Sequence, residues 1–568
     1  MKFIIISGGV LSGLGKGITA ASIGLLLKTK GYKTTIMKCD MYLNIDAGTM
    51  NPVEQGEIFV THDGVETDQD LGHYERFLGE NLFRENYLTN GRIYKEVLEK
   101  ERSLFYDGVC VEPYHHIPPE IISNWKKAAK KHKAEILIVE LGGTVGEYEG
   151  LLFYEAARRI KLRSPKDVCF IHVGYLPAPA SIGELKSKPI QQSISQLHSL
   201  GIQPDFIICR AEKEVDLKRK DKISLASNVS VENIISNPDV ENVYKVPLVL
   251  QKQGLDRKII KSLHLKSRKG KSLFLKKWKK SIDSSPKRKV KIAVVGKYQK
   301  TGDYLFSDSY VCVIEAIKHS ARFLELKHEI LWFDSSEFDN LSQKEIGDKL
   351  SGVNGIIVPQ GWGSRGVEGK INAVQFAREN KIPYLGLCFG MQMATVEFGR
   401  NVIGLKNANS QEVNPQTPYP VIHIIPNQAD YLSKKQYGGT IRLGAWPCLI
   451  KKGTLLERVY RKYGSELDAP WYQINSQTAE NQKPAKARLI FERHRHRYEF
   501  NNRYRKLYQE KGFIISGTSP DGDLVEAIEL SDHPFFVGTQ FHPEYLSHPL
   551  SPHPIFLSFI ESCIKNKK

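Results

Sequence analysis

Residues 2–17 of this 568-residue chain read KFIIISGGVLSGLGKG. An apolar run over residues 2–7 is followed by a glycine-rich turn, and residues 18–30 then show the apolar spacing of a helix that stops at Gly31. A second apolar run follows at 34–37. This order of strand, glycine loop, helix and strand predicts an α/β unit with a parallel sheet.

Further along the chain, several continuous apolar stretches of strand length occur, as expected of parallel sheets that are covered on both faces. In the first half they are 135–139, 168–173 and 206–209, and in the second half 292–295, 329–333, 355–358, 384–387 and 535–540, with a helix near 310–323. The predicted fold class is therefore α/β, with two doubly wound domains.

The lysine-rich stretch 267–290 contains Ser284-Ser285-Pro286 and is predicted to be a linker. It would join a first domain at 1–266 to a second at 291–568. Residues of about 462–488 are polar and weakly patterned, which predicts a surface insertion whose role the sequence leaves open.

Composition narrows the class of protein. The chain has 81 Lys+Arg against 63 Asp+Glu, a net charge of +18, and is 41% hydrophobic, which excludes a disordered or collagen-like chain. Its 8 cysteines form no C-x-x-C pair, which favours reduced thiols over a disulfide framework or a zinc site. No apolar run is long enough for a signal peptide or a membrane span, so we expect a soluble cytoplasmic protein that does not bind a membrane.

The positive charge by itself would attract nucleic acid, anionic membranes or small polyanions alike. Many of the basic residues lie in 257–291 and 565–568, where a solvated linker and tail are the simpler explanation. Charge alone is therefore the weakest basis for a function, and we expect no nucleic-acid partner.

The glycine-rich turn of residues 7–17 is typical of a phosphate site, because backbone N–H groups there converge on a phosphate and the helix dipole assists them. Lys16 would reach the outer phosphates. The match to the G-x-x-x-x-G-K-[ST] pattern is imperfect, since Val10 replaces the first glycine and Gly17 replaces the Ser or Thr that usually holds magnesium. A glycine turn without a ligand is the alternative.

Magnesium would then need carboxylates from elsewhere, because it prefers oxygen ligands and usually bridges substrate phosphates. Asp70 and Glu140 are candidates, and Glu140 follows the apolar run at 136–139, at the strand end where ligands of open α/β sheets bind. The segment 183–193 carries two lysines with amide and hydroxyl groups, which would suit a second triphosphate, although a basic surface loop is the default interpretation.

In the second half, Gly386-Leu387-Cys388-Phe389-Gly390 places a cysteine on a tight turn between a strand and a helix, the architecture of a nucleophile elbow. The base would be His542, oriented by Glu544. The loop 359–366 can supply a backbone N–H to an oxyanion hole beside that of Phe389. The predicted chemistry is hydrolysis of a small amide through a thioester.

Taken together, these motifs resemble the CTP synthase family, whose members make CTP from UTP, ATP and glutamine. The resemblance covers nearly the whole chain. It rests on residues 7–17, 51–60, 68–76, 140–146, 183–191, 365–370, 386–392, 493–499 and 540–544.

The resemblance implies a P-loop synthetase domain similar to dethiobiotin synthetase and a class I glutamine amidotransferase domain. It implies catalytic roles for Cys388, His542 and Glu544, and Mg²⁺ on Asp70 and Glu140. The implied ATP contacts are Gly13, Leu14, Gly15, Lys16, Gly17, Ile18, Asp70, Asp239 and Val240. The implied contacts of UTP and of CTP are Ser12, Glu147, Tyr148, Glu149, Lys186, Ser187, Lys188, Pro189, Ile190, Gln191 and Lys222. The implied glutamine contacts are Gly361, Phe389, Gly390, Met391, Gln392, Glu412 and Arg497.

The implied reaction is phosphorylation of the uracil O4 by ATP, followed by displacement of phosphate by ammonia, the last step of CTP synthesis. Ammonia would travel through an internal tunnel, because its nucleophilic lone pair is lost as ammonium at neutral pH. The resemblance also implies activation by GTP, feedback inhibition by CTP and assembly as a homotetramer.

The chain departs from the usual family pattern at several positions. Gln360 stands where the oxyanion loop usually has a glycine, and Trp362 where Phe is usual. Gln55 stands in place of a tunnel-gating His and cannot titrate as imidazole does. Pro238 replaces a usual Lys near the adenine, and Glu147-Tyr148-Glu149 replaces Asp-Ile-Glu.

Two alternatives stay open. A cobyrinic-acid-type amidotransferase pairs a similar ATP domain with a similar glutaminase fold, although the pyrimidine segments 68–76 and 183–191 argue against it. A non-catalytic assembly or regulatory protein would keep nucleotide sites without turnover. The joint presence of the catalytic candidates Cys388, His542, Glu544, Lys16, Asp70 and Glu140 argues against it.

Overall fold

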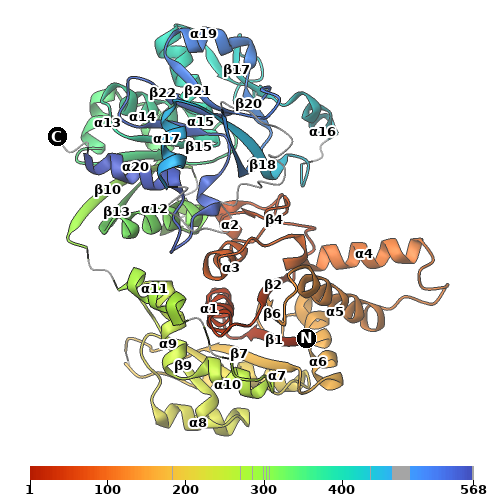
Figure 1. Cartoon of the computed structure of the whole chain (residues 1–568). Coiled ribbons are helices and arrows are strands. Elements are labelled where there is room, and N and C mark those ends of the chain that lie inside the picture. Colours follow the sequence, from red (N-terminus) through yellow and green to blue (C-terminus); the bar gives the residue numbers. More distant parts are fainter. Residues whose placement is uncertain are drawn as a thin grey trace. The chain divides into compact units, whose positions relative to one another are not determined.

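The structure is a computed structural model that describes residues 1–181, 183–268, 270, 272–283, 286–297, 300–301, 304–305, 307–434, 437–463 and 487–565. The chain divides into two compact units (Figure 1). Unit 1 consists of Met1–Asp46, Asp70–Leu78 and Leu82–Ile282, and unit 2 of Ala47–Gln69, Gly79–Asn81 and Asp283–Lys568.

Unit 1 is built on a seven-stranded sheet of order β5-β2-β6-β1-β7-β8-β9, in which every neighbouring pair is parallel. The strands are β1 (Lys2–Gly8), β2 (Thr34–Asp40), β5 (Tyr87–Thr89), β6 (Ile136–Leu141), β7 (Val168–Tyr175), β8 (Phe206–Ala211) and β9 (Ile234–Pro238). From β1 the chain continues to β2 on one side, and from β7 it continues to β8 on the other. The loop after β1 therefore lies at a topological switch point, where ligands of such sheets bind.

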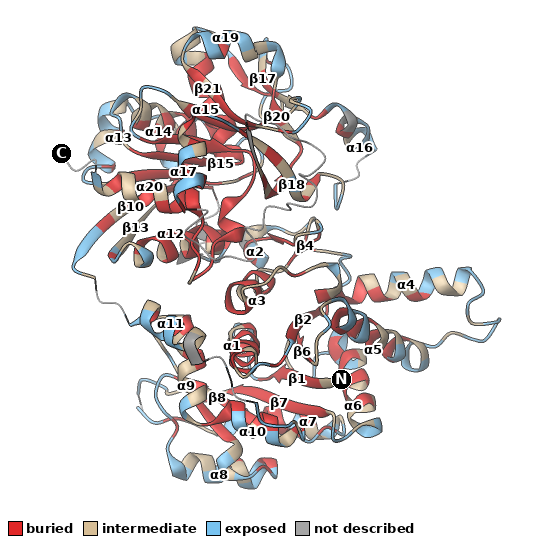
Figure 2. Cartoon of the chain, viewed as in Figure 1, coloured by how far each residue is buried: buried red, intermediate tan, exposed pale blue. Residues whose placement is uncertain are grey.

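Helices cover both faces of this sheet (Figure 1). They are α1 (Lys16–Thr29), α3 (Asp70–Leu78), α4 (Asn90–Arg102), α5 (Pro113–Lys131), α6 (Leu151–Arg163), α7 (Lys188–Ser199), α8 (Leu217–Ser227), α9 (Val246–Lys252), α10 (Leu255–Ser262) and α11 (Ser272–Ile282). Side chains of β2 alternate between the two layers: Ile36 lies against Gly24 of α1, whereas the Cys39 thiol accepts a hydrogen bond from the Trp125 indole of α5. Because both faces are covered, β2 and β6 are buried along their whole length (Figure 2).

Helix α11 lies inside the stretch that was predicted to be a linker. Phe274, Trp278 and Ile282 recur at helical spacing between the lysines, and Trp278 is 1% exposed. Its ring centroid lies 5.5 Å from that of Phe77 and 5.6 Å from that of Tyr244. Part of this stretch is thus packed into unit 1, while the functional domain boundaries at 266 and 291 stay a prediction.

Unit 2 is built on a nine-stranded sheet of order β13-β10-β14-β15-β23-β22-β21-β18-β19, parallel from β13 to β23 and antiparallel beyond. The strands are β10 (Arg288–Gly296), β13 (Leu326–Asp334), β14 (Gly355–Val358), β15 (Tyr384–Leu387), β18 (Arg442–Lys451), β19 (Ala487–His496), β21 (Phe513–Thr518), β22 (Val525–Leu530) and β23 (Phe536–Thr539). Smaller strands are β3 (Phe59–Val60), β4 (Glu66–Thr67), β11 (Lys300–Thr301), β12 (Tyr304–Leu305), β16 (Ala408–Ser410), β17 (Tyr419–Ile424) and β20 (Tyr498–Phe500).

Two apolar clusters lie on the two faces of this sheet, one beneath α14 (Val367–Glu379) and α15 (Phe389–Phe398) and the other beneath α12 (Val311–Phe323) and α20 (Pro554–Lys565). The helices of unit 2 are α2 (Pro52–Gln55), α12 (Val311–Phe323), α13 (Gln343–Lys349), α14 (Val367–Glu379), α15 (Phe389–Phe398), α16 (Ala429–Ser433), α17 (Leu455–Tyr463), α19 (Arg505–Glu510) and α20 (Pro554–Lys565). Two doubly wound α/β units are thus present, and the predicted fold class is confirmed.

Unit 2 also contains residues 47–69, which come from the first half of the sequence. Two buried arginines of β19 hold this segment: Arg495 pairs with Glu66 at 2.8 Å, and Arg493 donates a hydrogen bond to the Val60 carbonyl at 2.9 Å. The segment forms α2, β3 and β4 (Figure 1).

Of the predicted insertion at 462–488, residues 464–486 lie outside the described part of the chain. Among the helices that the structure describes, none has the length and apolar character needed to cross a membrane.

Candidate functional site

The nucleophile candidate Cys388 occupies a strained turn between β15 and α15. Its φ of 50° and ψ of −98° lie in the left-handed half of conformational space, which residues with a Cβ rarely adopt. The flanking glycines allow this turn: a Cβ on Gly390 would lie 1.9 Å from the Val358 carbonyl oxygen, and one on Gly386 would lie 2.8 Å from the Gly390 carbonyl carbon. The two glycines of the motif are therefore required by close backbone approach.

The base candidate His542 follows β23, the neighbour of β15 in the sheet. Its Nδ1 lies 2.7 Å from Oε1 of Glu544, and both side chains are buried. Burial lowers the pKa of His542, but the charges of Glu544 and Cys388 outweigh it and raise the pKa to about 10. The site therefore favours an imidazolium beside the cysteine, as a thiolate nucleophile requires.

A pocket joins these groups to most of the predicted glutamine contacts. Cys388 and His542 line it together with Gln360, Gly361, Trp362, Phe389, Gln392, Glu412, Arg495, His496, Arg497 and Tyr498. Of the predicted glutamine contacts, Gly390 and Met391 are absent from this lining: Gly390 packs against the Val358 backbone, and Met391 is buried in the core of the unit.

The loop 359–363, which forms one wall of this pocket, is held by polar contacts. Lys370 donates to the Pro359 carbonyl at 2.6 Å, Lys297 donates to the Trp362 carbonyl at 3.2 Å, and the Gly363 N–H donates to Glu412 at 2.8 Å. Burial raises the pKa of Glu412 to about 7 and lowers the pKa of Lys297 to about 8. Both lysines also lie near the ring of Phe389, with Lys297 Nζ 4.3 Å from its centroid.

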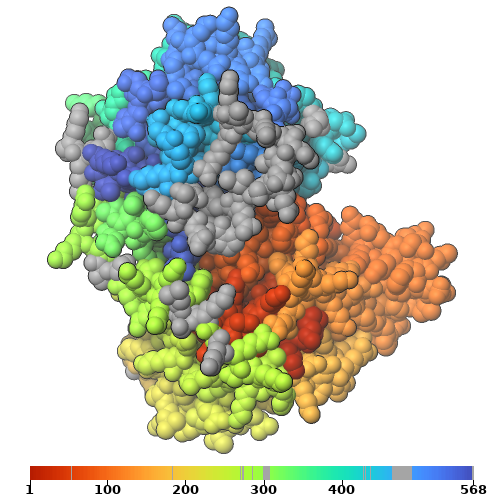
Figure 3. All heavy atoms as spheres, viewed as in Figure 1, coloured from red at the N-terminus to blue at the C-terminus, as the bar shows by residue number. Residues whose placement is uncertain are grey.

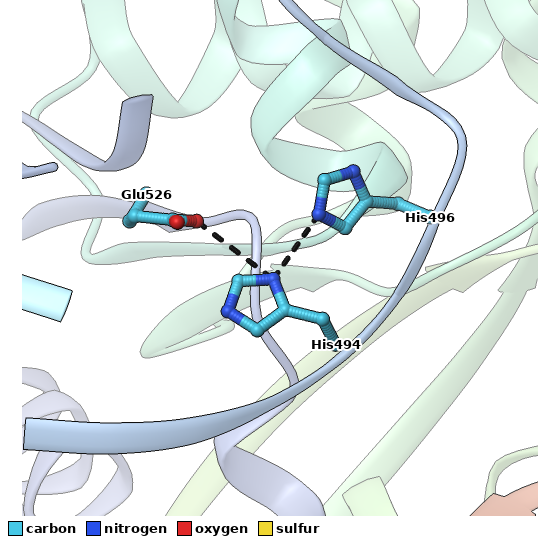
Figure 4. Close-up of side chains that lie close together, drawn as sticks. All are labelled: His494, His496 and Glu526. Atoms are coloured by element: carbon cyan, nitrogen blue, oxygen red, sulfur yellow. Dashed lines mark hydrogen bonds and ion pairs between the residues drawn. The ribbon is translucent and has the colours of Figure 1, made fainter. Parts of the chain in front are cut away.

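Near the pocket, the buried side chains of His494, His496 and Glu526 gather at metal-ligand distances (Figure 4). Nδ1 of His494 lies 3.1 Å from Nε2 of His496 and 3.7 Å from Oε2 of Glu526. Arg442 contacts all three, at 3.4 Å from each histidine and 2.7 Å from Glu526. Because a guanidinium already supplies the cation, we assign no metal to this cluster.

In unit 1, the phosphate-site candidate Lys16 begins α1 directly after the glycine turn, in which Gly13 and Gly15 have φ of 72° and 79°. Its Nζ donates to the Gly143 carbonyl at 2.7 Å, and burial lowers its pKa. A Cβ on Gly17 would lie 2.2 Å from Oδ1 of Asp70. The carboxylate thus occupies the space that a Ser or Thr side chain would need, which explains why this P-loop has glycine there.

The two predicted magnesium ligands, Asp70 and Glu140, both bond to Lys38 at the end of β2. The ammonium lies 3.2 Å from Oε1 of Glu140, whose other oxygen accepts from the Tyr74 hydroxyl. Burial opposes ionisation of both acids, but Lys38 outweighs it at Asp70 and lowers the pKa there, whereas the pKa of Glu140 is raised. Lys38 already supplies a cation to these two carboxylates, as Arg442 does in the histidine cluster. What fits magnesium here is the pair of oxygen donors beside the phosphate loop, and the ion would have to take the place of the Lys38 ammonium.

The predicted pyrimidine-nucleotide contacts begin next to this cluster. A Cβ on Gly143 would lie 2.3 Å from Oε2 of Glu147, so Glu147 lies against the residue that Lys16 bonds. Gly146 lies close to Gln196 of α7, and α7 begins within the predicted segment, where Gln191 donates to the Ser187 hydroxyl at 3.1 Å.

Several predicted nucleotide contacts lie on the surface of unit 1. Ser12 and Tyr148 are exposed, as is Lys222 of α8, a helix that belongs to the yellow part of the chain in Figure 3. Asp239 follows β9 and accepts from Arg210 at 2.7 Å, while Nε of the same arginine would lie 3.9 Å from a Cβ on Gly15. Arg210 thus bonds to the end of β9 and to Asp239 and lies near the glycine turn.

Two family models match the chain: "CTP synthase N-terminus" over residues 2–265 and "Glutamine amidotransferase class-I" over residues 305–562. A CTP synthase of Caldanaerobacter subterraneus subsp. tengcongensis is 47% identical over 100% of this chain and 99% of its own length. That of Sulfolobus acidocaldarius is 50% identical over 98% of this chain and 99% of its own. The chain belongs to the CTP synthase family.

Among solved structures, the glutaminase domain of Trypanosoma brucei CTPS with bound acivicin is 34% identical and covers 49% of this chain and 95% of that chain, with a TM-score of 0.41.

The sequence analysis did not predict several residues that the structure brings to the candidate sites around Cys388 and Lys16. Lys38 and Arg210 are charged residues near the carboxyl ends of apolar strands, a position that could have marked them as ligand-facing. Glu57 lies in the glutaminase unit although its sequence neighbours include the synthetase motifs, and no local signal predicts that placement.

Proposed function

We propose that this protein converts UTP to CTP with ATP, using ammonia that it releases from glutamine. The observation that carries the proposal is the similarity of the chain to CTP synthases over its full length. Two groups of side chains support it, one around Cys388 and His542 and one around Lys16 and Lys38. Glutamine hydrolysis and CTP synthesis would then each use a separate group of side chains.

For glutamine hydrolysis, we assign Cys388 as the nucleophile and His542 as the acid and base. The Cys388 thiolate forms a bond to the amide carbon, His542 gives its proton to the nitrogen, and the carbon–nitrogen bond breaks to release ammonia. Water, deprotonated by His542, then cleaves the thioester to glutamate. Glu544 holds the imidazole through Nδ1, and backbone N–H groups at Gly361 and Phe389 would stabilise the oxyanion.

For the synthetase reaction, we assign ATP to the glycine turn. Lys16 and Lys38 would neutralise the charge of the phosphate group that is transferred from ATP to the uracil O4. Asp70 and Glu140 would hold Mg²⁺, which when bound neutralises part of the triphosphate charge. Ammonia then attacks C4 of the phosphorylated UTP and phosphate leaves. The support is the Lys38 contact to both acids and the Lys16 contact beside Glu147.

We further propose that UTP, and CTP as an inhibitor, bind along Glu147–149, the segment 186–191 and Lys222, that GTP activates glutamine hydrolysis, and that ammonia reaches UTP by an internal route. The support for the nucleotide site is the proximity of Glu147 to the Lys16 partner Gly143 and of α7 to the same loop.

We also propose that unit 1 contacts further copies of the chain. The helices α4 and α5 lie side by side and extend beyond the sheet (Figure 1). Large apolar side chains are exposed on and around them: Leu43, Leu98, Leu104, Phe105, Val109 and Tyr114. Because soluble proteins rarely expose such a group, we propose that copies cover it in a homotetramer.

The decisive experiment measures CTP formation by absorbance from UTP, ATP and Mg²⁺, with either ammonium or glutamine plus GTP as nitrogen source. Cys388→Ala should lose at least 99% of the glutamine-dependent rate and keep the ammonium-dependent rate, because the synthetase site needs only ammonia. Cys110→Ala is the matched control, since Cys110 is exposed in unit 1.

The absence of CTP with either nitrogen source in the wild type would overturn the synthetase assignment. A cobyrinic-acid-type amidotransferase or a non-catalytic protein would then be the better reading. Formation of CTP from ammonium alone would leave the synthetase assignment intact and reject the glutaminase one.

A further inference from the structure

Gln360 belongs to the loop 359–363, which forms one wall of the pocket around Cys388. Its backbone is held in place, because the Gln360 carbonyl accepts from the Tyr310 hydroxyl at 3.3 Å and from Lys370 at 3.4 Å. The side chain lines the same pocket as Cys388 and His542.

The orientation of its carboxamide is determined by Glu57. Nε2 of Gln360 lies 2.8 Å from Oε1 of Glu57, and the other Glu57 oxygen accepts from the Cys312 N–H at 2.6 Å. A carboxylate only accepts hydrogen bonds, so the amide nitrogen of Gln360 must face it. The carboxamide oxygen is therefore directed away from Glu57.

The carboxamide oxygen of Gln360 takes no part in the contact with Glu57. Oε1 of Gln360 is buried and has no hydrogen-bond partner among the residues that the structure describes. A buried acceptor without a partner is unfavourable, and a donor that enters the pocket would relieve it. Glutamine carries such a donor at its side-chain amide nitrogen.

We propose that Oε1 of Gln360 accepts a hydrogen bond from the side-chain amide nitrogen of bound glutamine and holds this nitrogen as it departs. Glu57, which is not among the residues that line the pocket, is the positioning residue that orients the acceptor. The inference rests on the proposed glutaminase reaction and adds a residue that selects the amide.

The chemistry of amide cleavage explains why this hydrogen bond would raise the rate. As the Cys388 sulfur bonds to the amide carbon, the nitrogen loses its conjugation with the carbonyl and takes a proton from His542, so it becomes a more positive donor. A fixed acceptor near this nitrogen is bound more strongly in the transition state than in the ground state, and such interactions raise kcat. A γ-glutamyl ester has no N–H at this position and gains nothing from the acceptor.

The test compares two substrates in the full-length enzyme with UTP, ATP, Mg²⁺ and GTP: glutamine and the γ-methyl ester of L-glutamate, each assayed by glutamate release. In Gln360→Met, which keeps the length and removes the acceptor, kcat/KM for glutamine relative to the ester should fall about tenfold, the factor that one hydrogen bond supplies. Gln375→Met, an α14 variant outside the pocket, is the matched control and should leave the ratio unchanged.

A second variant keeps the test decisive if the first fails to fold. Glu57→Gln removes the carboxylate that orients the carboxamide, and we expect a smaller fall in the same ratio, of about threefold. Equal losses for amide and ester in the folded variants would mean a purely structural role, and an unchanged ratio would mean no contact. Either result overturns the proposal.

The synthetase half of the proposed function is tested separately in the same preparations. CTP formation from ammonium should be the same in wild type, Gln360→Met and Glu57→Gln. Its absence in the wild type would reject the proposed function, whereas its presence together with an unchanged substrate ratio would reject only the role of Gln360.

Discussion

At the scale of single residues, we expect the charges around His542, the proposed acid and base, to set the pH range of glutamine hydrolysis. The raised pKa of about 10 depends on Glu544, which bonds Nδ1 of the imidazole at 2.7 Å. The imidazolium exists below that pKa and is lost as the pH rises through it. Activity that needs the thiolate–imidazolium pair should therefore decline at alkaline pH.

We expect Glu544→Gln to shift the alkaline limb of the kcat/KM profile for glutamine to lower pH, because the charge that raises the His542 pKa is gone. The rate at neutral pH should fall by at least tenfold. Measuring glutamate release between pH 6 and pH 10.5 checks this. The ammonium-dependent synthesis of CTP provides the internal control, and an alkaline limb that stays in place would contradict the role of Glu544.

Gly17 gives a second prediction at this scale. Gly17→Ser restores the residue that ordinary P-loops have, but its Cβ would displace the Asp70 carboxylate, which lies 2.2 Å from that position. We expect CTP formation from ammonium to fall at least tenfold while glutamine hydrolysis persists. Gly13→Ala is not a suitable control because its φ is 72°; Ser12→Ala, on the exposed start of the turn, is the better comparison for expression and folding. A fully active Gly17→Ser would show that Asp70 need not occupy this place.

At the scale of elements, the segment 47–69 is part of the glutaminase unit. Its Glu57 bonds Gln360, its Ile58 carbonyl accepts from the Tyr545 hydroxyl at 3.0 Å, and the Tyr545 ring stacks on His542 at a centroid distance of 4.9 Å. The segment therefore contacts the pocket wall directly and supports His542, the proposed acid and base, through Tyr545.

The ion pair between Glu66 of β4 and Arg495 of β19 tests this role. Glu66→Ala leaves a buried guanidinium without its carboxylate, and we expect a loss of about 3–5 kcal/mol in the stability of the unit. Denaturant unfolding followed by Trp fluorescence measures it. Glu368→Ala, which removes the half-exposed partner of Arg400, should cost at most about 1 kcal/mol. Equal effects of the two variants would contradict the structural importance of the segment.

At the scale of the whole molecule, the exposed apolar side chains of unit 1 bear on assembly. Leu98 on α4 is 60% exposed and lines a shallow hollow with Leu43 and Ile45. Placing a charge there should oppose any contact that buries this hollow, because an unpaired charge is costly to desolvate.

We expect the wild type to be a tetramer in light scattering and Leu98→Asp to shift the population to smaller species. Leu225→Asp on α8, where Leu225 is 87% exposed, is the matched control and should leave the mass unchanged. A wild type that is monomeric at all concentrations, or a tetramer that tolerates Leu98→Asp, would contradict a copy–copy interface at α4.

The sequence by itself determined the two α/β units, the succession of strand, glycine loop and helix at the first site, and the family. Buried parallel strands are continuous apolar runs, and both the phosphate turn and the Cys388 elbow are short segments whose glycines meet local backbone demands. Such features depend on neighbours within a few residues, so a single sequence carries them. Helix α11 was not predicted, because the lysines between Phe274, Trp278 and Ile282 obscure its apolar spacing.

Only the tertiary structure decided which side chains complete the sites. Lys38 reaches Asp70 and Glu140 because β2 and β6 are neighbours in the sheet, and Asp70 fills the space beside Gly17. Glu57 orients Gln360 across 303 positions of sequence. These partners are brought together by packing of distant segments, and no local pattern of charge or hydrophobicity records which distant carboxylate or lysine will lie within hydrogen-bond reach.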